Sequence, residues 1–571
     1  MRKLLIVAGV ILALFAFNVL ALAQQAPASQ TAGAVSSREK ISQKFKTLEE
    51  RVKEKREVAK EAPTEEIVLP DEGPKVLITK IVVEYAVLLS EKEIREIIAP
   101  FENTELSVQG MQKIADLISA AYRKKGYVTS RAYLPPQTIS DGVLIIRVVE
   151  GTLGQLGIKG NKHFSTPLLK KRIGIEPEGY FDYSALQRSL VYINEHPDRT
   201  VKAVLTPGQE PGTTDIVVEV DDRRPMHAGF YYDNYGSRYI GRDRYSLVFE
   251  HNNLFGQDDK LYIKGQMAED SHLYLQQGRY TYPLSRRLEL GGHLLFSKLK
   301  LGQEFAGLDS GGKSKIFGLF SNYRLVERDN WDMRLNFGLD VKDITNELSG
   351  AELSHDELSI AKVGFDLDAE DDWGRTVLTA ALETGIADFL GSMEAKDPNA
   401  SRAGAGGKFT KGVFNVFRLQ PMPFSTWILL KNSFQLSNYN LVAAEQFQIG
   451  GATSVRGYPP GEYSGDQGFY SALEWSVPFY GLSRDFRVPF RKEKLYDTFR
   501  FVFFFDIGGV TLNNPQVGED EHRTIRAAGF GGRLTIPEEL EIRVEVGYPL
   551  SGPTPSDSDH AHVWIEFRYK I

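Results

Sequence analysis

From residue 226 to the C-terminus, large hydrophobic residues recur at every second position in many short runs. Residues 260–264, 334–342 and 541–548 alternate in this way, and turn-forming residues separate one run from the next. An alternation of this kind predicts β-strands with one apolar and one polar face. About sixteen such runs follow residue 226, an even number, as in bacterial membrane barrels.

The length of the runs bears on whether these strands form a soluble sandwich or cross a membrane. Sandwich strands also alternate but are usually shorter, whereas a tilted strand needs about ten residues to cross the hydrocarbon of a bilayer. No segment after residue 22 reaches roughly 18 consecutive apolar residues, so the mature chain could not cross as helices. We predict an all-β transmembrane barrel of about 16 antiparallel strands over residues 225–571, with apolar side chains toward lipid and charged ones toward a wet lumen.

The first residues predict export. Arg2 and Lys3 precede an apolar stretch over residues 4–22, and Ala21-Leu22-Ala23 is a small-x-small cleavage pattern. We therefore expect residues 1–23 to be a signal peptide. The apolar stretch is nearly long enough to span a bilayer, so an uncleaved anchor stays open as the alternative.

Residues 24–74 are predicted to contain an N-terminal helix and a linker. Residues 24–37 have the composition of an Ala/Gln/Ser-rich tether, and residues 63–74 that of an acidic linker with prolines. Between them, residues 38–61 form a charged segment with its apolar residues on one helical face. These residues are Ile41, Phe45, Leu48 and Val52. This helix could plug the barrel, pair with another helix or dock in the periplasm.

Residues 75–151 and 152–224 have a different pattern, in which strands and helices alternate. The first segment predicts a strand, a helix, a second helix over residues 107–125, and strands over residues 127–134 and 143–149. The second segment repeats this order. The sequence therefore predicts two β-α-α-β-β units in tandem.

Charge and motifs indicate no catalytic chemistry. The formal net charge of -7 offers no basic field for nucleic acid, and a chain with no cysteine has no thiol chemistry. Residues 307–314 fit the spacing of a nucleotide-binding loop, but a strand follows them instead of the required helix. The ten histidines form no ligand-spaced cluster. We predict no catalytic residues, no metal site and no cofactor, and we do not expect an enzyme.

A long connection over residues 441–467 is a candidate gate for the lumen. It contains Val455, Arg456, Gly457 and Tyr458, and the guanidinium of Arg456 seeks a carboxylate when it leaves bulk water. Downstream, alternation over residues 501–508 places Asp506 on the lumen face. Two readings stay open from spacing alone: the two residues pair, or each is a separate solvated charge.

The sequence resembles the two-partner-secretion transporters, the TpsB type of the superfamily that also contains the BamA barrel-assembly proteins. Three matches carry the resemblance: Val455-Arg456-Gly457-Tyr458, Phe505-Asp506-Ile507-Gly508, and Tyr133-Leu134-Pro135-Pro136-Gln137 followed by residues 141–151. The resemblance implies α+β periplasmic POTRA domains followed by a sixteen-stranded barrel. It also implies that the motif loop folds back into the lumen, where Arg456 pairs with Asp506, close to Gly508.

The function implied by this resemblance is export of one large β-helical exoprotein across the outer membrane. We expect the client to bind along the edge of the first POTRA domain, through main-chain hydrogen bonds and side-chain pockets. The residues of this edge are Tyr127, Val128, Arg131, Tyr133 and Leu134. Outer-membrane lipid, and the barrel-assembly machinery during biogenesis, are the other expected partners.

Two other functions stay open from sequence. A BamA-like insertase would use the same barrel to assemble other outer-membrane barrels, although such proteins usually carry more POTRA domains. A passive porin would need no POTRA domain. The sequence also departs from the usual pattern at two places: it ends in Ile571, whereas outer-membrane barrels commonly end in Phe, and Pro459-Pro460 stiffens the motif loop.

Overall fold

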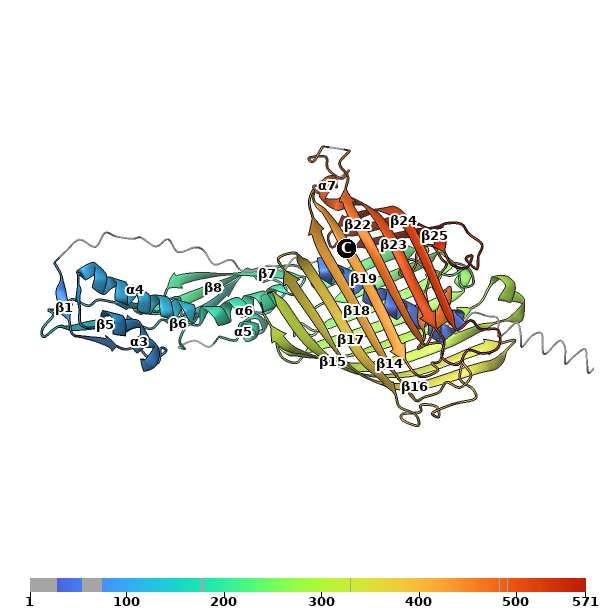
Figure 1. Cartoon of the computed structure of the whole chain (residues 1–571), viewed down its shortest axis with the longest axis horizontal. Helices are drawn as coiled ribbons and strands as arrows, with labels where there is room; N and C mark the ends of the chain where they lie inside the picture. Colours follow the sequence, from blue (N-terminus) through green and yellow to red (C-terminus); the bar gives the residue numbers. More distant parts are fainter. Residues whose placement is uncertain (1–27, 54–73, 176–178, 329, 482, 490) are drawn as a thin grey trace, which may run out of the picture. The chain divides into compact units, whose positions relative to one another are not determined.

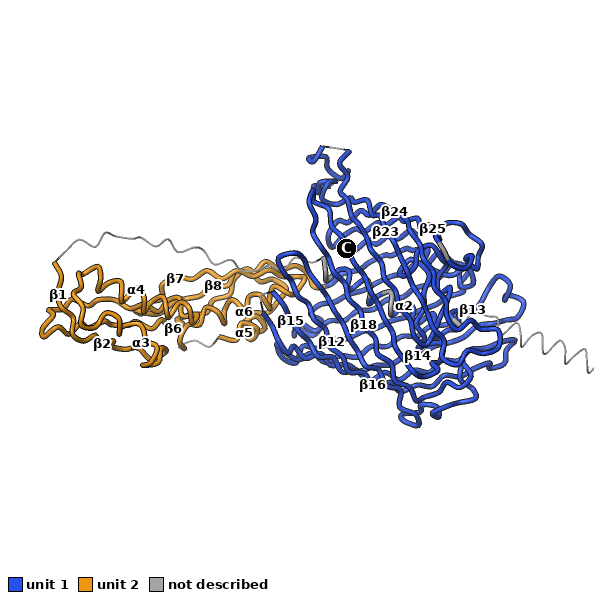
Figure 2. Tube along the Cα trace, viewed as in Figure 1, with its two compact units in different colours: residues 1–55, 226–571 blue, residues 56–225 orange. Residues whose placement is uncertain are grey.

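The computed structural model describes residues 28–53, 74–175, 179–328, 330–481, 483–489 and 491–571. The predicted signal peptide and most of the predicted linker lie outside these residues. The chain forms two compact units, one of residues 1–55 with 226–571 and one of residues 56–225 (Figure 2). Among the described residues, no helix has both the length and the apolar character needed to span a membrane.

The C-terminal part of the first unit is a closed barrel of antiparallel strands, as predicted (Figure 1). Its sixteen strands are β9 (Met226–Asp233), β10 (Arg244–His251), β11 (Lys260–Ala268), β12 (Leu273–Pro283), β13 (Leu288–Lys300), β14 (Gly311–Glu327), β15 (Trp331–Leu348), β16 (Ala351–Asp371), β17 (Gly374–Gly385), β18 (Phe409–Met422), β19 (Thr426–Ser437), β22 (Gln467–Pro478), β23 (Phe499–Thr511), β24 (His522–Ile536), β25 (Leu540–Ser551) and β26 (His562–Lys570). Each strand pairs with the next along the chain, and β26 pairs with β9 to close the barrel. Short helices η3 (Glu269–Ser271), η4 (Gln303–Leu308) and α7 (Leu495–Thr498) lie in connections.

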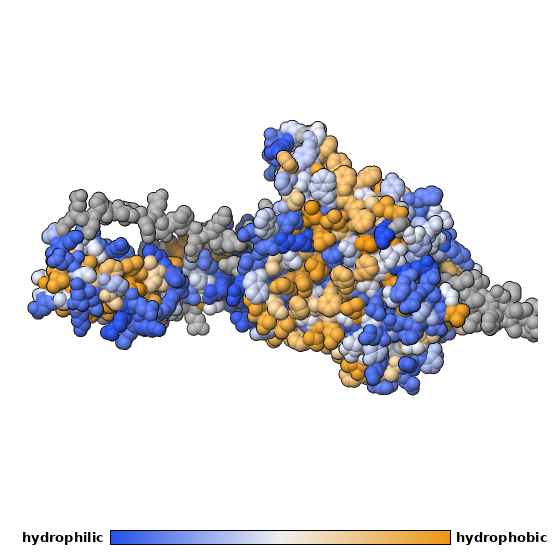
Figure 3. All heavy atoms as spheres, viewed as in Figure 1, coloured by the Kyte–Doolittle hydropathy of each residue, from blue (hydrophilic) through white to orange (hydrophobic). Residues whose placement is uncertain are grey.

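The alternation in sequence becomes an alternation between the two faces of the barrel wall. In β23, Phe501, Phe503 and Phe505 are exposed, whereas the alternating residues Val502, Phe504 and Asp506 are buried inside. Figure 3 shows hydrophobic residues spread over the outer surface of the barrel. Polar side chains inside the barrel and apolar side chains on its outer surface are the arrangement that a lipid-facing barrel requires.

A helix, α2 (Ala32–Lys53), lies inside the barrel and packs against strands on several sides of the lumen, including β13, β14, β17 and β18 (Figure 2). It begins earlier than predicted, so the expectation that residues 24–37 form only a tether was wrong. The small residues at its start allow this: a Cβ on Gly33 would meet that of Ala444 at 2.7 Å. The side chain of Asn346 accepts a hydrogen bond from the N–H of Ala32 at 3.1 Å. The small residues at the start of α2, whose composition resembles that of a tether, therefore allow close packing against the barrel interior.

The second compact unit contains the two predicted β-α-α-β-β units. The first comprises β1 (Val76–Ile78), β2 (Lys80–Glu84), α3 (Glu91–Ile98), η2 (Ala99–Phe101), β3 (Thr104–Leu106), α4 (Val108–Lys124), β4 (Arg131–Tyr133) and β5 (Val143–Val149). The second comprises β6 (Thr152–Lys159), α5 (Thr166–Ile173), α6 (Tyr183–Asn194), β7 (Arg199–Pro207) and β8 (Thr213–Asp222). The sheet orders β2-β5-β4 and β6-β8-β7 are the same, with the first strand parallel to the middle one in each.

The predicted strand over residues 127–134 is shorter than expected. Gly126 ends α4 with a left-handed φ of 95°, and Tyr127 donates its N–H back to the carbonyl of Tyr122 at 3.0 Å. A turn follows, in which Ser130 donates to the carbonyl of Tyr127. Tyr127 and Val128 therefore lie in a turn and not on the strand, because the end of the helix uses the N–H of Tyr127 and the turn uses its carbonyl.

Candidate functional site inside the barrel

The connection between β19 and β22 folds back into the barrel. It forms its own two-stranded hairpin, β20 (Phe447–Ile449) with β21 (Tyr463–Gly465). The motif residues Val455, Arg456 and Tyr458 lie between these strands and are 0–2% exposed. A charged side chain buried to this degree requires partners, so the surroundings of Arg456 decide what the loop can do.

Arg456 forms a bidentate ion pair with Asp506 of β23. Its Nη2 donates to Oδ1 at 2.7 Å and its Nε donates to Oδ2 at 2.8 Å. The backbone N–H of Arg456 also donates to Oδ2 at 3.1 Å. Two parallel hydrogen bonds from the planar guanidinium fix the orientation of the side chain as well as its position. The structure thus brings together the loop and strand residues singled out in the sequence.

Two further carboxylates from the wall complete the site, and sequence analysis missed both. The Nη1 of Arg456 donates to Glu474 of β22 at 2.8 Å and to Glu545 of β25 at 2.9 Å. Both glutamates occupy inward-facing positions of alternating strands, which is the signal that could have found them. We call Arg456, Asp506, Glu474 and Glu545 the Arg456 cluster.

Aromatic side chains of the wall also hold the loop. The guanidinium carbon of Arg456 lies 3.5 Å from the ring centroid of Phe504, in cation–π geometry. The indole N–H of Trp564 on β26 donates to the carbonyl of Arg456 at 2.8 Å. The loop is therefore bound to strands β22, β23, β25 and β26 through one residue.

Two glycines of the motifs allow the loop to approach the wall. A Cβ on Gly457 would lie 2.7 Å from the backbone nitrogen of Pro549. A Cβ on Gly508 of β23 would lie 2.9 Å from a methyl carbon of Val455. Because the first contact is with backbone, even a methyl group at residue 457 would push the loop away from the strand.

Helix α2 joins the same charge network. Glu49 accepts hydrogen bonds from Lys431 at 2.8 Å and from Arg533 at 3.4 Å. Lys431 and Arg533 both donate to Glu474 as well, each at 2.9 Å. Glu474 therefore connects the helix to Arg456 through shared cations.

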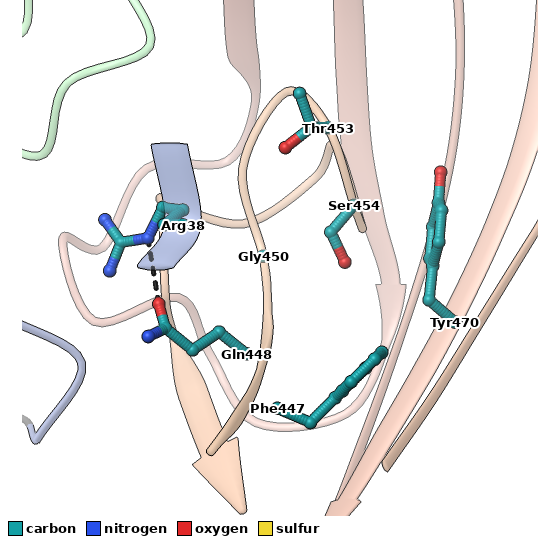
Figure 4. Close-up of a pocket in the computed structure, with 7 residues that line it drawn as sticks. All are labelled: Arg38, Phe447, Gln448, Gly450, Thr453, Ser454 and Tyr470. Carbon is teal, nitrogen blue, oxygen red and sulfur yellow. Dashed lines mark hydrogen bonds between the residues drawn. The ribbon is translucent and has the colours of Figure 1, made fainter. Parts of the chain in front are cut away.

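The start of the helix contacts the loop directly. The Nε of Arg38 donates to Oε1 of Gln448 at 2.9 Å, beside a small pocket that the helix and the loop line together (Figure 4). Ser37 donates to the carbonyl of Ala444 at 2.6 Å. A displacement of α2 would break these bonds, so the helix and the loop cannot move independently without loss of contacts.

The residues expected to bind a client fall into two groups in the structure. Arg131 and Tyr133 lie on β4 and are exposed, and Leu134 follows them, partly buried. Tyr127 packs against the hydrophobic core of the first β-α-α-β-β unit, and Val128 packs against the core of the second. These two residues therefore contribute to packing and offer little surface to a client.

The free edge of β4 is partly occupied. Ser119 of α4 accepts the N–H of Ala132 at 2.9 Å and donates its own proton to the carbonyl of Ala115 at 2.8 Å. An extended client that adds a strand here would have to displace the serine hydroxyl. An extended client would therefore meet less obstruction in side-chain contacts beside the edge than in backbone pairing with β4.

Two titratable groups of the first POTRA-like unit have shifted pKa values. Hydrogen bonds from Lys125 and Ser90 lower the pKa of Glu93 to about 2. Burial, together with a 2.7 Å hydrogen bond to Glu150, raises the pKa of the Tyr122 phenol. Both groups stabilise the fold around α4 and keep one charge state at neutral pH.

One group of described residues has the spacing of metal ligands. Asp557, Asp559 and His562 have ligand atoms within 4.8 Å of one another. Arg242 forms ion pairs with both aspartates, at 3.3 and 3.2 Å. A cation is therefore already in place beside these carboxylates.

The chain is similar to known outer-membrane transporters. It is 25% identical over 437 residues to the outer membrane transporter CdiB of Escherichia coli O6:K15:H31 (strain 536 / UPEC), which covers 74% of this chain and 73% of that protein. It is 21% identical over 489 residues to the heme/hemopexin transporter protein HuxB of Haemophilus influenzae (strain 86-028NP), covering 83% of each. The solved structure of CdiB from Escherichia coli matches with a TM-score of 0.75 at 22% identity, over 94% of this chain and 99% of that one.

Two family models match the chain in sequence order. The model of the POTRA domain, ShlB-type, matches residues 76–151. The model of the haemolysin secretion/activation protein ShlB/FhaC/HecB matches residues 212–534, more than half of the chain. The chain therefore belongs to the ShlB/FhaC/HecB family of haemolysin secretion/activation proteins, as an outer-membrane translocation pore with its POTRA domains in the periplasm.

Proposed function

We propose that this pore exports one large β-helical exoprotein by two-partner secretion, and that α2 and the loop between β19 and β22 close its lumen at rest. The observation that carries the proposal is the Arg456 cluster. It holds the loop against the wall and shares Glu474 with the cations that bind α2. A closing element made of two connected parts suits a pore that must open for a client and seal afterwards.

The way in which α2 is held supports reversible closure. The helix binds the wall through ion pairs that include Glu39 with Lys264 at 2.6 Å and Lys46 with Glu566. Buried ion pairs return little net stability, because desolvation offsets most of their attraction. Water can solvate the same charges once the helix leaves. The helix can therefore be specifically placed without being held by a large free energy.

Client recognition is assigned to the POTRA domains. The side chains of Arg131 and Tyr133 are exposed on the edge strand β4. A cation and an aromatic ring suit an extended client that is anchored by its side chains. After docking, displacement of the loop and of α2 would open the lumen, and folding of the client outside would bias its passage.

We further propose how the chain divides into functional segments and how the barrel reaches the membrane. Residues 1–23 act as a signal peptide, residues 24–74 as the helix and linker, residues 75–151 and 152–224 as POTRA 1 and POTRA 2, and residues 225–571 as the barrel. The barrel enters outer-membrane lipid through the barrel-assembly machinery.

A binding experiment tests the recognition step. The purified full chain is mixed with the N-terminal module of the exoprotein that is encoded beside its gene, and the dissociation constant is measured. Arg131→Glu combined with Tyr133→Ala should weaken binding at least about tenfold, since exposed aromatic and Arg anchors each contribute more than about 1 kcal/mol. Tyr180→Ala, a similarly exposed ring in POTRA 2, is the matched control. Equal binding by all three proteins would contradict this placement of the docking site.

A further inference from the structure

The connection between β22 and β23 is unusually long for its side of the barrel. The POTRA domains directly precede β9, so β9 starts at the periplasmic end. Strand direction alternates, and the twelfth strand, β22, therefore returns to that end. Other turns there are short, such as residues 328–330, 423–425 and 537–539, as is usual for periplasmic turns. The connection over residues 479–498, which we call the periplasmic hairpin, breaks this rule and protrudes from the barrel in Figure 1, where it carries α7.

The periplasmic hairpin is basic in a chain that is acidic overall. It contains five basic and three acidic residues, whereas the whole chain has a formal net charge of -7. All five basic side chains are exposed. They are Arg484, Arg487, Arg491, Lys492 and Lys494. A local excess of exposed positive charge points to an anionic partner.

Aromatic rings connect the periplasmic hairpin to the lipid-facing surface. Phe479 packs against Phe501 of β23 with ring centroids 5.6 Å apart, and Phe501 faces outward. Tyr480 is 52% exposed, and its hydroxyl donates to the carbonyl of Phe424, itself 85% exposed in the neighbouring turn. Phe486 is 46% exposed. Exposed rings at the rim of a membrane barrel are typical of the interface with headgroups.

Part of the positive charge is available to a ligand. Lys494 pairs with Asp485 at 2.8 Å, and Arg491 pairs with Glu539. Among the described residues, Arg487 and Lys492 have no salt bridge. Both line an open hollow together with Arg491, Val488, Pro489 and the single acidic residue Glu493, so basic side chains outnumber acidic ones there by three to one. Figure 3 shows hydrophilic and hydrophobic residues side by side on this projection.

We propose that the periplasmic hairpin binds anionic phospholipid of the inner leaflet of the outer membrane. Its exposed rings, Tyr480 and Phe486, lie in the headgroup region, while Arg487 and Lys492 bind lipid phosphate. The continuity of the rings with the outer surface of β23 favours lipid over a soluble protein partner. Amphipathic segments with basic and aromatic residues bind anionic bilayers in this way.

A quenching experiment on the full-length protein tests this proposal. The chain has no cysteine, so a single Ser483→Cys variant places one fluorescent label on the hairpin and leaves its rings intact. A label at Val517→Cys, in the exposed loop on the opposite side of the membrane, is the control for a probe in water. The labelled proteins are reconstituted with phosphatidylethanolamine alone or with phosphatidylglycerol added, both with brominated acyl chains.

The label at residue 483 should be quenched more than the label at residue 517, and phosphatidylglycerol should increase that quenching. Arg487→Glu with Lys492→Glu should lower the ratio of bound to free hairpin by about fivefold for each charge lost, because one basic residue near an anionic surface contributes about that factor. Lys396→Glu with Lys408→Glu, a matched reversal in the connection between β17 and β18, should change nothing. Equal quenching at residues 483 and 517 would overturn the proposal. So would quenching that responds neither to phosphatidylglycerol nor to the reversal at residues 487 and 492.

Discussion

Replacing Arg456 by Ala should release the motif loop from the wall and leave the barrel assembled. The guanidinium supplies two of the three hydrogen bonds that Asp506 accepts among the described residues. Glu474 and Glu545 lose a partner too, but both keep Arg533, at 2.9 and 2.6 Å. Asp506 therefore carries most of the cost. None of these side chains faces lipid, so insertion of the barrel should be unaffected.

The expected magnitude follows from the burial of the pair. Removing one partner of a buried ion pair costs about 3–5 kcal/mol. That would lower the ratio of seated to released loop roughly a hundredfold to a few thousandfold. A double-mutant cycle with Asp506→Ala should show a coupling of about 2–3 kcal/mol, because the second replacement removes the charge that the first left unpaired.

Hydrogen exchange followed by mass spectrometry measures this release in the protein held in detergent. Amides of residues 447–465 should lose protection in Arg456→Ala, whereas amides of β9 to β19 keep theirs. Arg375→Ala is the matched control, because Arg375 forms a similar bidentate pair with Asp368, at 2.8 and 2.9 Å, within the wall. Unchanged exchange at residues 447–465 in Arg456→Ala would refute the reasoning.

Three further predictions concern the loop, the helix and POTRA 1. Gly457→Ala should deprotect the same amides as Arg456→Ala, since its Cβ would meet the wall backbone at 2.7 Å; protection equal to that of the native chain would contradict this. Glu49→Gln should raise the conductance of the pore in planar bilayers, because it leaves Lys431 and Arg533 with one carboxylate fewer and destabilises α2 by about 3 kcal/mol; an unchanged conductance would mean that α2 is held by other contacts. The lowered pKa of Glu93, about 2 against an ordinary 4.5, predicts that its contribution to stability is present above pH 4.5 and is lost as the pH falls from there toward 2. Thermal unfolding of residues 76–222 should lose that pH dependence in Glu93→Gln, and an identical pH profile would exclude the contribution.

The fold followed closely from the sequence where one physical pattern dominated. Alternation alone predicted a closed barrel of about sixteen strands, because each wall position faces either lipid or the lumen. The limits of β5 matched because Val143–Val149 is a run of strand-forming residues, five of them β-branched. The start of α2 was missed, since Ala and Gly selected for close packing look like a tether.

The site was only partly predictable. Arg456 and Asp506 carry recognisable motifs, but Glu474 and Glu545 are two among many inward-facing charges of the wall. Which of them meet one guanidinium depends on barrel register and on the path of the loop, and local sequence encodes neither. The start of β4 was mispredicted for a related reason: whether residues 127–130 extend this strand depends on how α4 ends at Gly126.

The most direct test of the account is export of the exoprotein encoded beside this gene. The exoprotein is co-expressed with the full chain or with a chain that lacks residues 76–222, and its appearance outside the cell is measured. Export is expected only with the full chain, while the shortened chain still reaches the outer membrane. If the exoprotein stays in the periplasm in both cases and other outer-membrane barrels assemble poorly without this protein, the account is contradicted and the chain acts in barrel assembly instead.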